Sequence, residues 1–165
     1  MYFKYMRYTG ALLFNGILIC LSLVFLSASV RQDDSVQQCA ERVLSRLNKM
    51  HHPEYELLKI RKFELLLSDE GFLRYRKTYN SGKQEYYSLN LTRVSSMDYL
   101  GDTASGNLLL KTIEDDVIVQ TYNDRDGNVD SMATQFRLEL HAVEPEDLLA
   151  LQNDILGMKQ LLKKN

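Results

Sequence analysis

The acidic run from Asn123 to Asp130 contains the residues best suited to binding a metal ion. When Gly127 is aligned with the invariant glycine of an EF-hand calcium loop, Asp124 and Asp126 fall at ligand positions. Tyr122 would then stand at the first ligand position, and no helices are expected on either side. An Asp-Gly hairpin turn explains the same residues more simply. We therefore predict a turn here and no metal site.

The histidines are the next candidates for chemistry. His51 and His52 could ligate a metal, but adjacent side chains at the end of a helix point apart. The proline that follows ends the helix, so we expect the two histidines to be capping or loop residues. A hydrolase needs a nucleophile beside a base, and the sequence has no Gly-x-Ser-x-Gly, Ser-x-x-Lys or His-Glu-x-x-His pattern. We therefore expect no catalytic residue, no cofactor and no enzyme activity.

The tyrosines favour binding over catalysis. Tyrosine combines an apolar ring with a polar hydroxyl, which suits a protein interface or an apolar ligand pocket. Ordinary packing on a sheet face is the alternative reading. Five of the ten tyrosines are concentrated in the strand-rich middle of the chain: Tyr75, Tyr79, Tyr86, Tyr87 and Tyr99.

Charge and cysteine content exclude two classes of protein. Lys4 and Arg7 are the only charged residues among the first 30, which leaves residues 31–165 with all 22 Asp and Glu residues and a net charge of about −4. Such a domain does not attract nucleic-acid phosphates, so no nucleic acid is expected as a partner. The two cysteines, Cys20 and Cys39, do not form a disulfide framework, and Cys39 is either a half-buried helix residue or an intermolecular link.

A hydrophobic segment near the N-terminus predicts a membrane anchor. No charged residue lies between Tyr8 and Val30, and residues 11–25 are almost wholly apolar. About 20 helical residues span the ~30 Å hydrocarbon core of a bilayer. We therefore divide the chain into a short cytoplasmic tail (1–8), a transmembrane helix (9–30) and a periplasmic domain (31–165). The bilayer is thus an expected partner.

A cleaved signal peptide is the alternative to an anchor. Lys4 and Arg7 resemble its basic region, and residues 27–29 resemble a small-residue cleavage site. The uncharged stretch is long for a signal peptide, which favours the anchor. Because a short basic tail resists crossing and a long domain is translocated largely regardless of its charge, we expect the N-terminus in the cytoplasm and the domain in the periplasm.

Three small or polar residues interrupt the hydrophobic segment. They are Asn15, Gly16 and Ser22. In a transmembrane helix such residues allow close approach or a hydrogen bond to a partner helix. They are the candidate membrane-partner contacts, and tolerance in a lipid-facing helix is the alternative.

The remaining sequence predicts an α+β fold. A helix is expected over Asp33–Met50, and a second one begins at Pro145, with Leu148, Leu151, Ile155, Met158 and Leu162 along one face. That face is expected to pack on the domain's own sheet or against another helix. Between the helices we expect a curved antiparallel sheet of about six strands, which could form a partial barrel. The expected strands are Tyr55–Leu67, Phe72–Tyr79, Gln84–Val94, Leu108–Ile113, Val117–Tyr122 and Val129–Val143.

The string from Arg7 to Gly16, RYTGALLFNG, resembles the FidL-like membrane proteins of enterobacteria. Those short proteins are encoded beside membrane-bound winged-helix regulators. In layout the chain is also similar to ToxS-type accessory proteins, which have one span and a β-rich periplasmic domain. The resemblance implies a single-pass inner-membrane accessory protein with a ToxR-like winged-helix regulator as its partner. It also implies that a sheet shared with the partner could bind a small apolar effector.

Two alternatives belong to other functional classes. One is a scaffold subunit of an envelope secretion or fimbrial assembly, and the other is a secreted periplasmic ligand-binding domain, if the signal is cleaved. The accessory role is favoured because about seven residues on the cytoplasmic side cannot form an output domain, so a signal would have to pass to a partner.

Overall fold

The computed structural model describes residues 35–51 and 60–164, and these belong to one compact unit, Asp34–Asn165. The expected cytoplasmic tail and transmembrane helix, with the contact residues Asn15, Gly16 and Ser22, lie outside the described residues. None of the described helices has the length and apolar character needed to cross a membrane.

Helix α2 (Val36–Met50) follows from a complete set of local signals. The side chain of Ser35 accepts a hydrogen bond from Gln38 N, and the Gln38 side chain accepts one from Ser35 N, so the capping box satisfies both exposed backbone donors. The buried positions recur at helical spacing: Cys39, Ala40, Val43, Leu47 and Met50. The helix ends where it was expected to end, and Cys39 is fully buried within it.

Within the described ranges, eight antiparallel strands form two sheets, which corrects the expected single sheet of about six strands. The first sheet has the order β1-β2-β3-β6-β7, with bounds β1 Ile60–Leu67, β2 Phe72–Tyr79, β3 Gln84–Asn90, β6 Val117–Tyr122 and β7 Asp130–Ala133. The second has the order β4-β5-β8, with bounds β4 Val94–Gly101, β5 Ser105–Thr112 and β8 Gln135–His141. The bounds predicted for β2 and β6 are confirmed.

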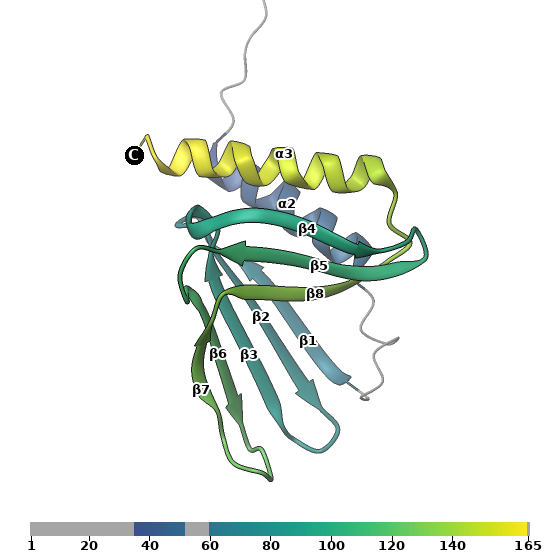
Figure 1. Cartoon of the computed structure of the whole chain (residues 1–165), viewed down its shortest axis with the longest axis vertical. Coiled ribbons are helices and arrows are strands. Elements are labelled where there is room, and N and C mark those ends of the chain that lie inside the picture. Colours follow the sequence, from purple (N-terminus) through teal and green to yellow (C-terminus); the bar gives the residue numbers. More distant parts are fainter. Residues whose placement is uncertain (1–34, 52–59, 165) are drawn as a thin grey trace, which may run out of the picture. The chain divides into compact units, whose positions relative to one another are not determined.

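The two sheets arise because the chain changes sheet at three places. After β3, a 3-10 turn (η2, Leu91–Arg93) redirects the chain into β4, a strand that the sequence analysis did not predict. The chain returns to the first sheet between β5 and β6. It leaves again at Thr134, so the single strand predicted over Val129–Val143 is two strands in different sheets. The strands of the second sheet run across those of the first (Figure 1).

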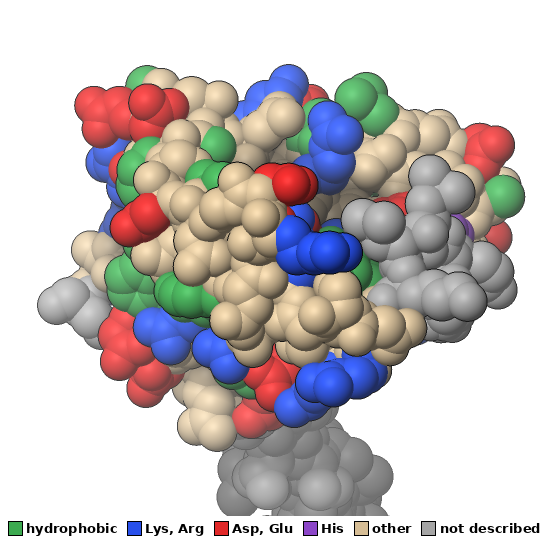
Figure 2. Space-filling view, turned by 90° about the horizontal axis from the view of Figure 1, so that it is seen from below, with side chains coloured by type: hydrophobic (Ala, Val, Ile, Leu, Met, Phe, Trp, Pro, Cys, Tyr) green, Lys and Arg blue, Asp and Glu red, His purple; other side chains and the backbone are tan. Residues whose placement is uncertain are grey.

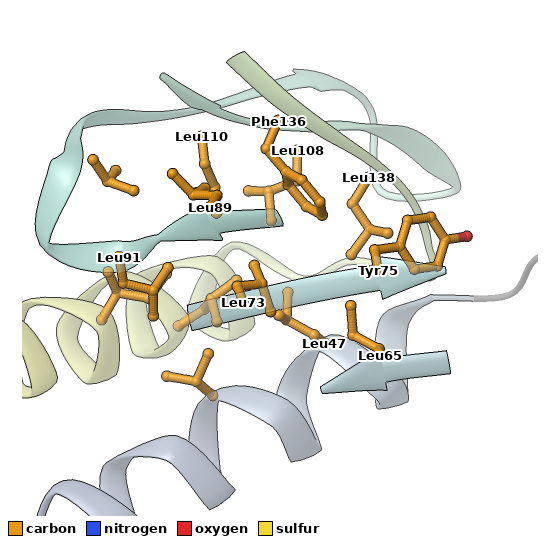
Figure 3. Close-up of a cluster of buried hydrophobic side chains, with 14 of the residues drawn as sticks. Leu47, Leu65, Leu73, Tyr75, Leu89, Leu91, Leu108, Leu110, Phe136 and Leu138 are labelled. Carbon is orange, nitrogen blue, oxygen red and sulfur yellow. The ribbon is translucent and has the colours of Figure 1, made fainter. Parts of the chain in front are cut away.

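The core lies between the two sheets and the two helices. Leu108, Leu110, Phe136 and Leu138 point from the three-stranded sheet toward Leu73, Leu89 and Tyr75 of the five-stranded sheet, and Leu47 of α2 lies near Leu65 and Leu73 (Figure 3). Every one of these side chains is nearly or fully buried. Burying a large apolar side chain stabilises the fold by roughly 1.5–3 kcal/mol, so this cluster holds the layers together.

Helix α3 (Pro145–Leu162) begins at the proline, as predicted, and packs on α2 and η2. Leu151, Ile155 and Met158 of its predicted apolar face are buried. Asp154 joins the two helices, because Oδ1 accepts from Arg42 Nε at 2.9 Å and Oδ2 from Arg46 Nε at 2.7 Å. The apolar face of α3 therefore packs mainly against helix α2 and the 3-10 turn η2.

Candidate functional site

The five-stranded sheet has an inner face in the core and an outer face that no described element covers. Side chains alternate between the faces, so the inner face of β2 carries Leu73 and Tyr75 while the outer face carries Arg74 and Arg76. The outer face includes exposed apolar side chains, among them Leu66, Phe72 and Met132. At the end that carries the β2–β3 and β6–β7 turns, its hairpin end, the sheet extends beyond the second sheet and the helices (Figure 1).

Strand β7 leaves one edge of this sheet open. It pairs with β6 on one side, and among the described strands it has no partner on the other. Val129 O accepts from Thr121 N at 2.9 Å, so Val129 and Ser131 direct their backbone groups toward β6. Because these directions alternate along an antiparallel strand, the backbone N–H and C=O groups of Asp130 and Met132 point away from the sheet. We call these four groups the β7 edge.

The β2–β3 and β6–β7 turns are held together beside this edge. Lys83 Nζ lies 2.8 Å from Asp124 Oδ2 and 3.3 Å from Glu85 Oε1. The Asp124 hydrogen bond raises the pKa of Lys83, and the same bond lowers the pKa of the Asp124 carboxyl. Glu85 Oε2 also accepts from the hydroxyls of Tyr79 at 2.8 Å and Tyr87 at 3.2 Å. The network keeps both turns in a fixed register.

The acidic run at 123–130 is the hairpin turn that the sequence predicted. Gly127 has φ +105°, which a residue with a side chain rarely adopts, and Asn123 also lies in the left-handed region at φ +54°. Asp124 Oδ1 accepts from Asp126 N at 3.2 Å, while the other oxygen binds Lys83. Within the described ranges, no group of three His, Cys, Asp or Glu side chains is placed to hold a metal.

The five predicted binding tyrosines do not form one surface. Tyr75 and Tyr79 are buried on the inner face, and the ring of Tyr87 lies 6.3 Å from the rings of both Tyr75 and Phe136. Tyr99 lies on β4 in the other sheet, where its hydroxyl donates to Asp102 O at 2.7 Å. Sheet-face packing therefore explains most of the tyrosines. Of these five, only Tyr86 faces outward from the five-stranded sheet.

His51 is a buried residue, and of the two roles expected for it, capping or loop, the structure shows the cap. It caps helix α2 and is only 2% exposed. Nδ1 lies 2.8 Å from Glu139 O of β8, and Nε2 lies 2.7 Å from the Tyr75 hydroxyl of β2. His51 therefore connects helix α2 to both sheets. No pattern in the sequence points to partners 24 and 88 residues away along the chain.

Charge is evenly mixed on the side of the domain seen from below in Figure 1. Acidic and basic side chains are interspersed there, with a smaller group of hydrophobic side chains beside them (Figure 2).

Comparisons with known proteins give no match: no family model fits the chain, and no curated protein or solved structure is significantly similar to it.

Proposed function

We propose that this chain is a single-pass inner-membrane accessory protein that modulates or stabilises a membrane-bound winged-helix transcription regulator. Its N-terminus lies in the cytoplasm, and its α+β domain binds the regulator in the periplasm. The anchor would bring the two proteins together in the membrane, with Asn15, Gly16 and Ser22 as the helix contacts. The β7 edge is the surface through which the domain binds.

The open backbone groups of β7 carry this proposal. An exposed strand edge presents unpaired donors and acceptors, and a strand from another protein can pair with them. Met132, which is 52% exposed, adds apolar surface on the outer face beside this edge. Pairing there would extend the five-stranded sheet into the partner. A small apolar effector bound by such a shared sheet stays a prediction.

Site-specific photocrosslinking from intact membranes tests the proposed contact. A photoreactive amino acid at Met132 should give a covalent adduct with a membrane protein that carries a winged-helix DNA-binding domain. The same amino acid at Leu149 of α3 is the control, because Leu149 is also apolar and is 60% exposed. The control position should give no such adduct.

A backbone substitution tests whether strand pairing makes the contact. Met132→Pro removes an outward N–H without removing a bond to β6, whereas Met132→Ala keeps that N–H. Because Met132 is substituted in these variants, the photoreactive amino acid is placed at Asp130. We expect the proline variant to lose the adduct formed from this position and the alanine variant to keep it. Equal thermal unfolding temperatures would show that both variants fold.

Other outcomes identify the alternative functions. An adduct with a secretion or fimbrial subunit in place of a regulator would support the scaffold role and contradict the accessory role. A mature N-terminus near Val30 would show that the signal is cleaved and would support the secreted ligand-binding domain. Unchanged regulator levels after deletion of this chain, together with no adduct at Met132, would rule out the accessory role.

A further inference from the structure

The outer face of the five-stranded sheet is hollowed near its hairpin end. The hollow has a volume of ≈ 610 Å³. It crosses β2, β3 and β6. Its lining is Arg76, Gln84, Tyr86, Gln120, Tyr122 and Asn123. Two aromatic rings, three amides and a single cation therefore surround it, and no carboxylate is among them.

Two copies of the same tripeptide pattern produce this lining. Gln84-Glu85-Tyr86 lies on β3, and Gln120-Thr121-Tyr122 lies on β6. The antiparallel register pairs Gln84 with Tyr122 and Tyr86 with Gln120. Each glutamine is therefore next to both tyrosines, and the two tyrosines lie diagonally across the strands, about 7–8 Å apart at their backbones. Amides and rings alternate across the hollow in both directions.

Part of this lining is held in place by its own hydrogen bonds. The Tyr122 hydroxyl donates to Gln120 Oε1 at 3.0 Å, and Gln120 Nε2 donates to Asp130 Oδ1 at 3.1 Å. The Arg76 guanidinium lies over the Tyr86 ring, 5.8 Å from its centroid. These contacts fix one tyrosine, one glutamine and one side of the other ring before any ligand arrives.

The remaining polar groups are available to a ligand. Gln84 makes no side-chain hydrogen bond within the described part of the chain, so its carbonyl oxygen and both amide hydrogens are free. Tyr122 is 45% exposed, which leaves ring surface open beside that amide. Asn123 stands at the rim, with only a long contact of 3.5 Å from Nδ2 to Gly82 O.

We propose that this hollow binds an uncharged saccharide. A sugar ring has an apolar C–H face that packs on an aromatic ring, and hydroxyl groups that both donate and accept hydrogen bonds, as an amide does. The charges nearby balance: Arg76 and Lys62 lie 3.6 and 2.6 Å from Glu64, and a second carboxylate, Asp130, accepts from Gln120. A polyanion would need several unpaired cations, and the hollow has only Arg76, which is paired with Glu64. A purely apolar ligand would bury the three amides without hydrogen bonds. This inference goes beyond the proposed function and does not depend on it.

Calorimetric titration of the full chain with two soluble probes tests the proposal. The probes are a β-1,4-linked tetramer of N-acetylglucosamine and a tetramer of glucose. The protein is kept in a zwitterionic detergent without a sugar headgroup, because a maltoside detergent would compete for the site. We expect saturable binding of at least one tetramer, and no saturable binding of either at roughly 10 mM would overturn the proposal.

Matched variants assign the binding to the hollow. Gln84→Ala removes the free amide and should weaken saccharide binding about 10-fold. Gln135→Ala, at an exposed side chain of β8, should leave saccharide binding unchanged. Tyr122→Ala should weaken binding by a similar factor, and Tyr122→Phe, which keeps the ring, should recover part of the loss. Unfolding temperatures equal to that of the parent protein would show that each variant is folded. Saccharide affinity unaffected by both Gln84→Ala and Tyr122→Ala would overturn the assignment.

The same variants separate a saccharide site from a protein interface. If Tyr122→Ala abolishes the adduct from Met132 while saccharide affinity is unchanged, the hollow belongs to the partner-binding surface and the saccharide proposal fails. If the saccharide binds and no adduct forms, the proposed regulator contact fails and the saccharide site stands.

Discussion

The Tyr75 hydroxyl and His51 Nε2 form a hydrogen bond across 2.7 Å, deep inside the domain. A backbone carbonyl can only accept, so the bond between His51 Nδ1 and Glu139 O requires the proton on Nδ1. In the neutral ring, Nε2 is then the acceptor for Tyr75. The imidazole also lies edge-on to the rings of Phe63 and Tyr75, with centroids 5.0 and 5.1 Å away. One side chain thus joins the end of α2 to strands from both sheets.

Loss of the Tyr75 hydroxyl should destabilise the domain without altering its shape. Tyr75→Phe removes the hydrogen bond between this hydroxyl and His51 Nε2, and removing one partner of a buried hydrogen bond costs about 1–3 kcal/mol of unfolding free energy. Tyr86→Phe is the control, because that hydroxyl faces outward from the same sheet, and the change should stay within about 0.5 kcal/mol. Urea unfolding followed by circular dichroism measures both, and equal losses would contradict the structural role of the His51 bond.

The contact between the two helices should depend on Asp154. Asp154→Asn removes the carboxylate that accepts from both Arg42 and Arg46. Both arginines are about one-third exposed, so solvent weakens the pairs and we expect a loss of roughly 1–2 kcal/mol. Lys49→Ala breaks the more exposed pair with Asp147 and should cost no more than about 0.5 kcal/mol. The difference between the two variants should shrink in high salt.

Two glycines should respond in opposite directions to alanine. Among the described residues, a Cβ at Gly157 in α3 would approach only Cys39 Sγ, at 4.0 Å, and alanine favours a helix by about 0.5–1 kcal/mol over glycine. A Cβ at Gly106 would lie 2.5 Å from the Tyr99 ring, so that Gly106→Ala should cost about 1–3 kcal/mol. Thermal unfolding measures both. A stabilising Gly106→Ala would mean that Tyr99 does not pack as described.

The β4–β5 turn should make stability depend on acid pH. Asp102 Oδ1 accepts from Ser105 N and Ala104 N, which holds the pKa of this carboxyl below its ordinary value. A carboxyl with a lowered pKa in the folded state stabilises the fold above its unfolded pKa of about 4, and that stabilisation is lost as pH falls through the folded pKa. Asp102→Ala should therefore lower the unfolding temperature at pH 7, and the gap from the parent protein should narrow in acid. A gap that stays constant with pH would show that the carboxylate charge contributes nothing.

Elements with a regular pattern and clear ends could be predicted from the sequence. Helix α3 follows from Pro145 and its apolar spacing, and β2 follows from its branched and aromatic residues between two turns. Strand β4 was missed because its central residues, Ser95 to Asp98, are mostly polar and are not an apolar alternation. Its position depends on Leu91, which is fully buried in the corner before it, and burial is set by the tertiary structure.

The candidate sites were harder to predict than the fold. The hollow depends on the pairing of Gln84 with Tyr122, and pairing between strands separated by a change of sheet cannot be read from one sequence. The repeated Gln-x-Tyr pattern was the available signal, since equal spacing on two strands places like residues on one face. The β7 edge depends on where the long predicted strand breaks, at Thr134, and the sequence has no glycine or proline there to mark it.

The attachment of the first helix to the last has a consequence for synthesis. Arg42 and Arg46 meet Asp154, which follows them by 112 and 108 residues, and the apolar face of α2 packs on α3 and beside β8. As a ribosome makes the chain from its N-terminus, α2 with its apolar positions Val43, Leu47 and Met50 therefore emerges long before α3, on which it packs. The nascent domain cannot complete its core until α3 has been synthesised. Until then the apolar face of α2 is exposed and could aggregate with other chains.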